Sequence, residues 1–329
     1  MRVLITGGAG FIGSHLAHAH LKRGDEVYII DDLSTGSIDN IKEFQENPKF
    51  SNRFFAHIDT IFNNNLLLEL AGTCDVIFHL AAAVGVRYIL NNPLESIRTN
   101  IQGTEAVLNI CSKFKKKVLI TSSSEVYGKH LHAPLVETDN IIYGPSIKSR
   151  WSYAASKLMD EFTALAYYRT KGLKTIVTRL FNTVGPKQTG AYGMVIPRFV
   201  NQALNNEPLT VYGDGKQTRT FTYVKDVVWA LMNLMGNENA VGEVFNVGGT
   251  EEIMILELAQ KIIDKTNSKS QINLIPYEEA FEKDFEDMQR RVPSIEKIKK
   301  IINFEPKTSL DKIIDEVISS SRKKRRDEV

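Results

Sequence analysis

The chain opens with the stretch Val3-Leu4-Ile5-Thr6-Gly7-Gly8-Ala9-Gly10-Phe11-Ile12-Gly13, and this stretch decides the fold. The apolar run before Thr6 is typical of a buried strand. Gly7, Gly10 and Gly13 recur at every third position, where a tight turn from strand to helix needs backbone freedom and close approach. The pattern predicts a βα unit whose helix, over 14–21, directs free N–H groups at a pyrophosphate.

Two carboxylates follow this turn at the spacing of a dinucleotide-binding unit. The run 27–30 predicts a second parallel strand, and Asp31 and Asp32 lie at its end, roughly twenty residues after the glycines. A carboxylate there accepts hydrogen bonds from an adenosine ribose and repels a 2′-phosphate. The sequence therefore predicts NAD rather than NADP. The alternative is a glycine turn of some other α/β protein, with aspartates that merely lie on the surface.

Strands and helices alternate through the first half of the chain. Further strands are predicted at 54–57, 75–80, 118–120 and 175–179, with helices at 93–113 and 153–171. This alternation predicts an α/β fold, a Rossmann-type doubly wound parallel sheet that binds ligands at the carboxyl ends of its strands. From Asn182 onward Pro, Gly and aromatic residues break the rhythm. We expect an NAD-binding domain over 1–181 and a smaller C-terminal substrate-binding lobe mainly over 182–329, with some chain returning to the first domain.

The predicted cofactor site draws on the glycine turn and on several later strand ends. Asp59 is expected to meet the adenine, and the small residues after His79 offer a surface for the dinucleotide. The full predicted set is Gly7, Gly10, Phe11, Ile12, Gly13, Asp31, Asp32, Ile58, Asp59, Leu80, Ala81, Ala82, Asn100, Ser122 and Lys157.

Tyr153 and Lys157 are four residues apart, so they share one face of the predicted helix. A tyrosine has an ordinary pKa near 10, but an adjacent ammonium and a nicotinamide cation both favour its phenolate. Ser123, at the end of the preceding strand, would complete a donor pair around a substrate hydroxyl. We therefore expect Tyr153 to act as the base of a nicotinamide-dependent alcohol oxidation. Taken alone, this Tyr-x-x-x-Lys spacing is a common accident on amphipathic helices.

Together these motifs resemble the extended short-chain dehydrogenase/reductase family that acts on nucleotide sugars. The resemblance runs nearly end to end. It rests on the glycine turn, Ser123-Ser124-Glu125-Val126-Tyr127-Gly128, Tyr153-x-x-x-Lys157, Phe78-His79-Leu80-Ala81-Ala82, Arg179-Leu180-Phe181-Asn182 and Val211-Tyr212-Gly213 through Arg219.

The resemblance implies a nucleoside diphosphate sugar in the C-terminal lobe. It places Asn182 and Arg219 on the phosphates and Arg291 near the nucleotide, with Ser124 and Tyr212 also binding substrate. A guanidinium suits a diphosphate because it binds bidentately. For Arg219 and Arg291 the alternative is an ordinary surface salt bridge.

The resemblance also implies oxidation of the sugar at C4, after which several outcomes stay open. Glu125 favours a uronate decarboxylase or a 4,6-dehydratase, because a carboxylate there can move a C5 proton. Ser124, however, stands where dTDP-glucose dehydratases carry an Asp, and Met194 where decarboxylases carry an Arg. Arg198 or Arg87 is a possible replacement for that Arg.

Our leading expectation is therefore 4-epimerisation of a UDP-hexose, with Ser123, Glu125, Tyr153 and Lys157 as the catalytic set. The alternatives are decarboxylation of UDP-glucuronate, then 4,6-dehydration. An alternative of another class is a non-catalytic NAD-binding regulator or scaffold, against which the intact Tyr153 and Lys157 argue.

Composition limits the other partners. The net charge of +2 demands no polyanion, and a short basic run over 322–326 is typical of a solvated end, so we expect no nucleic acid. Two cysteines without metal-site spacing predict reduced thiols and no metal. No apolar run reaches the ~20 residues that span a bilayer. These features predict a cytoplasmic protein without a membrane partner.

We also expect a homodimer. In the family that the chain resembles, two helices that flank the cofactor pair with those of a second subunit. Ala106, Val107 and Ile110 form an apolar stripe on one helix, and 162–166 forms another. The alternative is that both stripes face their own sheet.

Overall fold

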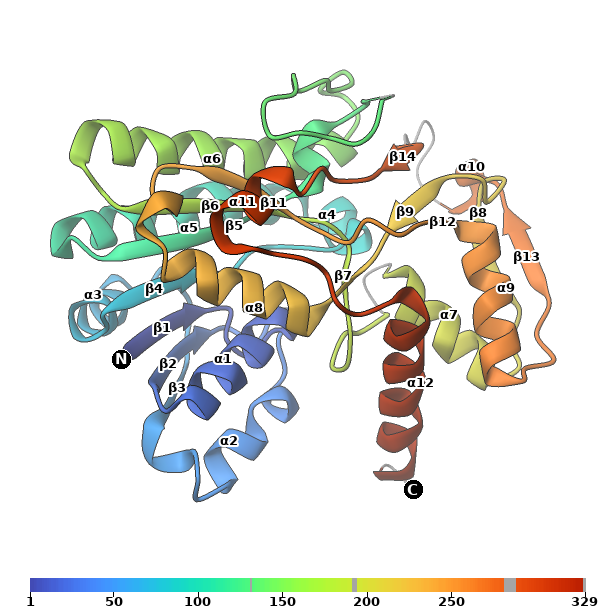
Figure 1. Cartoon of the computed structure of the whole chain (residues 1–329), viewed down its shortest axis with the longest axis horizontal. Helices are drawn as coiled ribbons and strands as arrows, with labels where there is room; N and C mark the ends of the chain where they lie inside the picture. Colours follow the sequence, from blue (N-terminus) through green and yellow to red (C-terminus); the bar gives the residue numbers. More distant parts are fainter. Residues whose placement is uncertain (131, 191–193, 281–287, 328–329) are drawn as a thin grey trace.

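A seven-stranded parallel sheet forms the centre of the molecule (Figure 1), in the order β11-β6-β5-β4-β1-β2-β3. The computed structural model describes residues 1–130, 132–190, 194–280 and 288–327. The strands are β1 Arg2–Thr6, β2 Glu26–Asp31, β3 Phe54–Ile58, β4 Val76–His79, β5 Lys117–Ser123, β6 Thr175–Leu180 and β11 Val244–Val247. The predicted doubly wound α/β fold is confirmed.

Helices cover both faces of this sheet. Successive residues of a strand point to opposite faces, so neighbouring residues belong to different cores. Val3 and Ile5 belong to a core formed with α1 (Phe11–Arg23) and α8 (Val224–Met235). Leu4, between them, belongs to a core formed with α3 (Asn64–Thr73) and α5 (Pro93–Phe114). Because both faces are buried, the strands read as continuous apolar runs rather than as alternating ones.

The helix α6 (Arg150–Lys171) lies beside α5 and packs on β5 and β6. It begins three residues earlier than predicted, and Gly172 ends it in a left-handed conformation that favours glycine. Shorter elements complete this half: η1 Ile38–Asn40, α2 Lys42–Glu46, η2 Ser51–Arg53, α4 Val86–Asn91 and η3 Ser124–Tyr127.

The second half of the chain builds a smaller lobe and also returns to the sheet. The lobe contains β8 Leu209–Tyr212, β9 Thr218–Thr220, β12 Glu252–Met254, β13 Ile272–Ile275, β14 Arg290–Arg291, α7 Val195–Leu204, α9 Ile255–Thr266, α10 Tyr277–Ala280 and α12 Leu310–Asp327. The short strands β7 Thr183–Val184 and β10 Thr222–Tyr223 pair with each other between the two parts. Residues of β11, α8, η4 (Glu238–Ala240) and α11 (Glu296–Ile302) lie against the large sheet.

One predicted contact surface is wrong in part. Val107 and Ile110 are buried in the core between α5 and the sheet, so this stripe faces its own subunit. On α6, by contrast, Phe162 is 59% exposed. Among the described residues, no helix is long and apolar enough to cross a membrane.

Candidate active site

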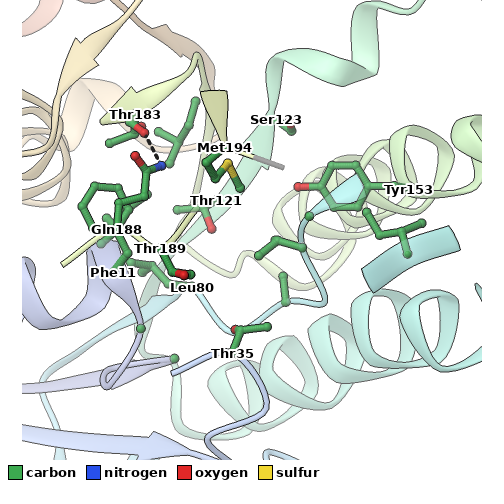
Figure 2. Close-up of a pocket in the computed structure, with 18 of the residues that line it drawn as sticks. Phe11, Thr35, Leu80, Thr121, Ser123, Tyr153, Thr183, Gln188, Thr189 and Met194 are labelled. Atoms are coloured by element: carbon green, nitrogen blue, oxygen red, sulfur yellow. Dashed lines mark hydrogen bonds between the residues drawn. The ribbon is translucent and has the colours of Figure 1, made fainter. Parts of the chain in front are cut away.

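A pocket of about 500 Å³ opens at the carboxyl ends of the central strands, and both halves of the chain line it. Figure 2 shows the Tyr153 ring directed into this pocket, with Ser123 near its hydroxyl side and Met194 across from it. Phe11, Leu80 and Thr35 lie at the other end. The pocket therefore joins the glycine turn to the predicted catalytic residues, as a parallel sheet requires when both follow strand ends.

The glycine turn is packed so closely against neighbouring backbone that a side chain at Gly7 or Gly13 would not fit. Gly7 has a φ of +72°, and a Cβ there would stand 2.8 Å from the backbone nitrogen of Ala81. A Cβ at Gly13 would collide with the carbonyl oxygen of Gly7. The helix α1 starts directly after Gly10 and has no acidic residue in its first turn. This is the cradle that a pyrophosphate needs, so the residues present fit a dinucleotide.

The two aspartates after β2 have different tasks. Asp31 is buried and accepts hydrogen bonds from the backbone N–H of Ala9 (2.8 Å) and of Leu33 (2.9 Å), so it ties the glycine turn to the strand end. Burial raises the pKa of Asp31, and these N–H groups oppose that rise. Asp32 is exposed at the rim of the pocket. Both aspartates line the pocket, and Asp32 is the more exposed of the two.

Two predicted cofactor residues do not line the pocket. Ile58 has a side chain that is 48% exposed, whereas its neighbours Asp59 and Thr60 do line the cavity. Ile58 is the last residue of β3, so alternation turns it away from the side that Asp59 faces. Asn100 is buried in α5, where it accepts from the Ala83 backbone N–H (2.8 Å) and donates to Ser156 (3.0 Å). It supports the pocket wall from behind.

The remaining predicted cofactor residues, Leu80, Ala81, Ala82 and Ser122, do line the cavity. The hydroxyl of Ser122 donates to Glu161 on α6, and Glu161 in turn binds the guanidinium of Arg179 on β6. This buried network fixes α6 against the end of β5. The position of Tyr153 thus depends on groups that sequence spacing does not reveal.

Burial raises the pKa of the Tyr153 phenol well above its ordinary value, and the charge of Glu125 adds to that rise. The hydroxyl of Ser123 and the charge of Arg291 act in the opposite direction. Without cofactor the residue is therefore a neutral phenol. A cation placed beside it, such as a bound nicotinamide, would favour the phenolate.

Glu125 lines the pocket and lies between two guanidinium groups. Arg291 donates to its Oε1 at 2.9 Å, and Arg150 lies 3.4 Å from its Oε2. Arg291 also donates to Asn182 Oδ1 at 2.7 Å, and Asn182 donates to the carbonyl of Thr220 at 2.8 Å. Arg291 was predicted to lie near the nucleotide, and in the structure its guanidinium binds Glu125, one of the residues predicted to be catalytic.

The other predicted substrate residues line the lobe side of the same pocket. Ser124, Tyr212 and Arg219 all face it, and the Arg219 side chain donates to the Thr218 carbonyl at 2.8 Å. Arg198 stacks on Tyr212, with its guanidinium carbon 4.3 Å from the ring centroid. Met194 lines the cavity, and the side chain of Arg87 lies outside the described residues.

Three contributors to the site were not among the predicted site residues. Arg150 precedes Tyr153 by three residues, and this helical spacing was the signal that could have revealed it. Gln188 lies in the pocket and donates to the carbonyl of Thr183 at 2.9 Å, as Figure 2 shows. Asp160, three residues after Lys157, binds the ammonium of that lysine at 2.7 Å.

The fold and this pocket define an NAD-dependent enzyme of the extended short-chain dehydrogenase/reductase class, acting on nucleotide sugars. Residues 4–317 match the sequence model of the family described as GDP-mannose 4,6 dehydratase, and the chain belongs to that family.

Relatives and solved structures agree with this assignment. The chain is 41% identical to UDP-N-acetyl-alpha-D-glucosaminuronate decarboxylase of Bacillus cytotoxicus, over 96% of each chain. It is 38% identical to UDP-glucuronic acid decarboxylase 1 of Arabidopsis thaliana, over 98% of this chain and 70% of that one. It superposes on UDP-glucuronic acid 4-epimerase of Bacillus cereus, solved with UDP-glucuronic acid and NAD, with a TM-score of 0.87 and 28% identity, covering 98% and 99% of the two chains.

Proposed function

We propose that this enzyme decarboxylates a UDP-uronate, that is, a UDP sugar with a carboxylate at C6. The main support for this proposal is a cluster of charged side chains in the pocket that also contains Tyr153. In this cluster Arg150 and Arg291 both pair with Glu125. Two guanidinium groups near Tyr153 suit a substrate carboxylate, because each can form charge-assisted hydrogen bonds with it. In a buried pocket without cations, the same carboxylate would be costly to bind. The named decarboxylase relatives, which act on uronates, support the same reading.

The chemistry follows from oxidation at C4. NAD, held by the glycine turn and Lys157, would supply the acceptor for the C4 hydride and the same hydride for the final reduction at C4. Tyr153 takes the proton of the C4 hydroxyl, while Ser123 donates a hydrogen bond to the same oxygen. The resulting 4-keto uronate is a β-keto acid, so its C5–C6 bond can break with the electron pair drawn into the C4 carbonyl. Carbon dioxide leaves, a proton is added at C5, and Tyr153 returns its proton to O4.

Each neighbouring residue has a task in this sequence. Lys157 lies one helical turn from Tyr153 and is placed to hold the cofactor ribose. Glu125 stands where a proton must reach C5, and Arg291 keeps this carboxylate in place through a 2.9 Å hydrogen bond. We assign the diphosphate to Arg219 and the nucleotide to the surface around Tyr212 and Arg198. Arg150 and Arg291 take the place of the arginine that is absent at Met194.

The test is a product analysis with a panel of UDP sugars: UDP-glucuronate, UDP-N-acetylglucosaminuronate, UDP-glucose and UDP-N-acetylglucosamine. The proposal requires release of carbon dioxide and formation of a UDP-pentose from at least one uronate. Tyr153→Phe, which removes the proton acceptor alone, should lower that rate by at least ~10²–10⁴-fold while retaining NAD binding.

A 4-epimer of a uronate, without carbon dioxide, would contradict the proposal and favour epimerisation. Epimerisation of UDP-glucose alone would restore the expectation drawn from the sequence. Loss of water would indicate a 4,6-dehydratase. No turnover of any sugar by a protein that still binds NAD and UDP would favour a regulatory role.

We further propose that the enzyme is a homodimer in which α5 and α6 of one subunit pack against those of the other. Phe162 and Met159 on α6 and Leu94 on α5 are exposed apolar side chains on neighbouring helices. A shallow groove on α6, lined by Met159, Phe162 and Ala166 among others, lies on the same face. A surface of this kind is costly to leave in water, and a second copy of the same helix pair would cover it.

A further inference from the structure

The catalytic helix carries a carboxylate that no step above uses. Asp160 Oδ2 accepts a hydrogen bond from Lys157 Nζ at 2.7 Å, and the two side chains are 1% and 4% exposed. A buried ion pair is costly to form and is often no more stable than an apolar pair of the same size. Its presence next to the residue that carries the chemistry therefore calls for a functional reason.

The pair changes the field at Tyr153. An ammonium alone would favour the phenolate, but a carboxylate 2.7 Å from the ammonium offsets much of that charge. The negative charge of Asp160 also raises the pKa of Tyr153 directly, after the larger effects of burial and of Glu125. Burial raises the pKa of Asp160 itself, and the ammonium of Lys157 opposes that rise.

We propose that Asp160 is a positioning residue that anchors the Lys157 ammonium and sets the base strength of Tyr153. One N–H of the ammonium is used by Asp160, which fixes the side chain and leaves two donors for other partners. Asp160 thus makes the Tyr153 phenol a weaker acid, and its phenolate a stronger base, than the lysine alone would allow. A stronger phenolate base takes the proton of the C4 hydroxyl more readily, whereas a higher pKa lowers the fraction of phenolate at a given pH, and Asp160 sets the balance between the two.

Other charged groups near the pair are held in place by their own contacts. Tyr153 faces Glu125 from η3 and Arg291 from β14. The charge of the neighbouring Glu161 raises the pKa of Asp160, and Glu161 itself binds Arg179 at 2.8 Å. On β4, burial and the charge of Lys157 lower the pKa of His79 to about 3, so this residue stays neutral over the working range. Asp160 and Glu125 are therefore the two carboxylates whose removal would change the charge around the phenol.

The test is a titration of the Tyr153 phenol in the NAD-loaded enzyme, read as the phenolate absorbance that Tyr153→Phe abolishes. Asp160→Asn keeps the shape of the side chain and removes its charge. We expect the titration midpoint to fall by about one pH unit, and the acidic limb of the oxidation rate to move with it. Should Asn prevent folding, Asp160→Ser removes the same charge with a smaller side chain.

Two matched variants separate charge from packing. Asp160→Glu retains a carboxylate and should restore most of the wild-type midpoint. Leu158→Ala alters the apolar packing of the same helix without a change of charge and should leave the midpoint in place. An unchanged midpoint in Asp160→Asn would show a purely structural role, and a raised midpoint would show that Asp160 serves only to keep Lys157 charged. The absorbance titration reads no product, so it stands or falls independently of the decarboxylase proposal.

Discussion

At the scale of single residues, the site depends on carboxylates that share a type but differ in task. Asp31 holds backbone N–H groups, and Asp32 is exposed to the pocket. Glu125 binds Arg291, and Asp160 binds Lys157. Environment rather than residue type decides which of them meets a ligand and which supports another group.

Glu125→Gln tests the chemistry after oxidation. The amide keeps the shape of the side chain but removes its charge and its capacity to move a proton. If C5 chemistry requires Glu125, the variant should stall after hydride transfer, with NADH absorbance and a 4-keto sugar accumulating on the enzyme. Rapid-quench analysis with a UDP-uronate measures both. Continued turnover at a rate near that of the wild type would mean that Glu125 takes no part in the lyase step.

Asp32→Ala tests cofactor selectivity. Loss of the exposed carboxylate should bring the Kd values for NAD and NADP closer together by roughly tenfold, because the 2′-phosphate is no longer repelled. Asp31→Ala serves as the contrast: it removes an acceptor for two backbone N–H groups and should cost about 1–3 kcal/mol of stability. Calorimetric titration of the cofactor-free protein and thermal unfolding distinguish the two. Selectivity retained in Asp32→Ala would move this role to another residue.

At the scale of elements, α1 joins the glycine turn to the rest of the molecule through His15. Its Nε2–H donates to the carbonyl of Pro186 at 2.9 Å, in the loop after β7. Burial, together with the positive charges of Lys187 and Lys225, lowers the pKa of His15 to about 4, although the hydrogen bond to Pro186 acts in the opposite direction. The structure thus holds a neutral imidazole at a contact between two parts of the chain.

This lowered pKa predicts an acid-dependent loss of stability. Between pH 6.5 and about 4, His15 binds a proton in the unfolded chain but not in the folded protein. The folded state therefore has its full stability with respect to His15 above pH 6.5 and loses part of it as the pH falls. His15→Gln keeps a donor for Pro186 without titrating. Over this interval the wild type should lose about 1–2 kcal/mol more unfolding free energy than His15→Gln. Denaturant unfolding at several pH values measures the difference, and parallel curves would contradict the assignment.

At the scale of the whole molecule, the two halves of the chain close around one pocket, and the catalytic helix also presents an apolar outer face. Phe162→Asp places a charge in the centre of the proposed α5–α6 contact, where an unpaired buried charge is costly. The variant should be monomeric at micromolar concentration, whereas the wild type should be dimeric by light scattering. Lys22→Asp, an exposed position on α1 at the other face of the sheet, controls for a general effect of surface charge. A monomeric wild type would refute the dimer.

The sequence alone determined the class of fold and most of the cofactor site. The glycine turn, the carboxylate at the end of β2 and the Tyr-x-x-x-Lys spacing are local patterns, and each can be interpreted because backbone geometry within a βα unit or a helical turn fixes it. The first six strands of the sheet were also predicted, since a sheet covered on both faces requires continuous apolar runs, whereas the edge strand β11 was not predicted.

Only the tertiary structure decided which distant residues meet. Arg291 follows Glu125 by 166 positions, yet donates to it at 2.9 Å, because β14 of the lobe returns to the pocket mouth. This contact could not be predicted, so the arginine was assigned to the nucleotide and the missing arginine at Met194 received more weight. Ile58 and Asn100 do not line the pocket for a related reason: adjacency in the chain does not tell which side of a strand or helix faces it. Contacts of this kind depend on how the lobe closes over the sheet, and no local pattern encodes that.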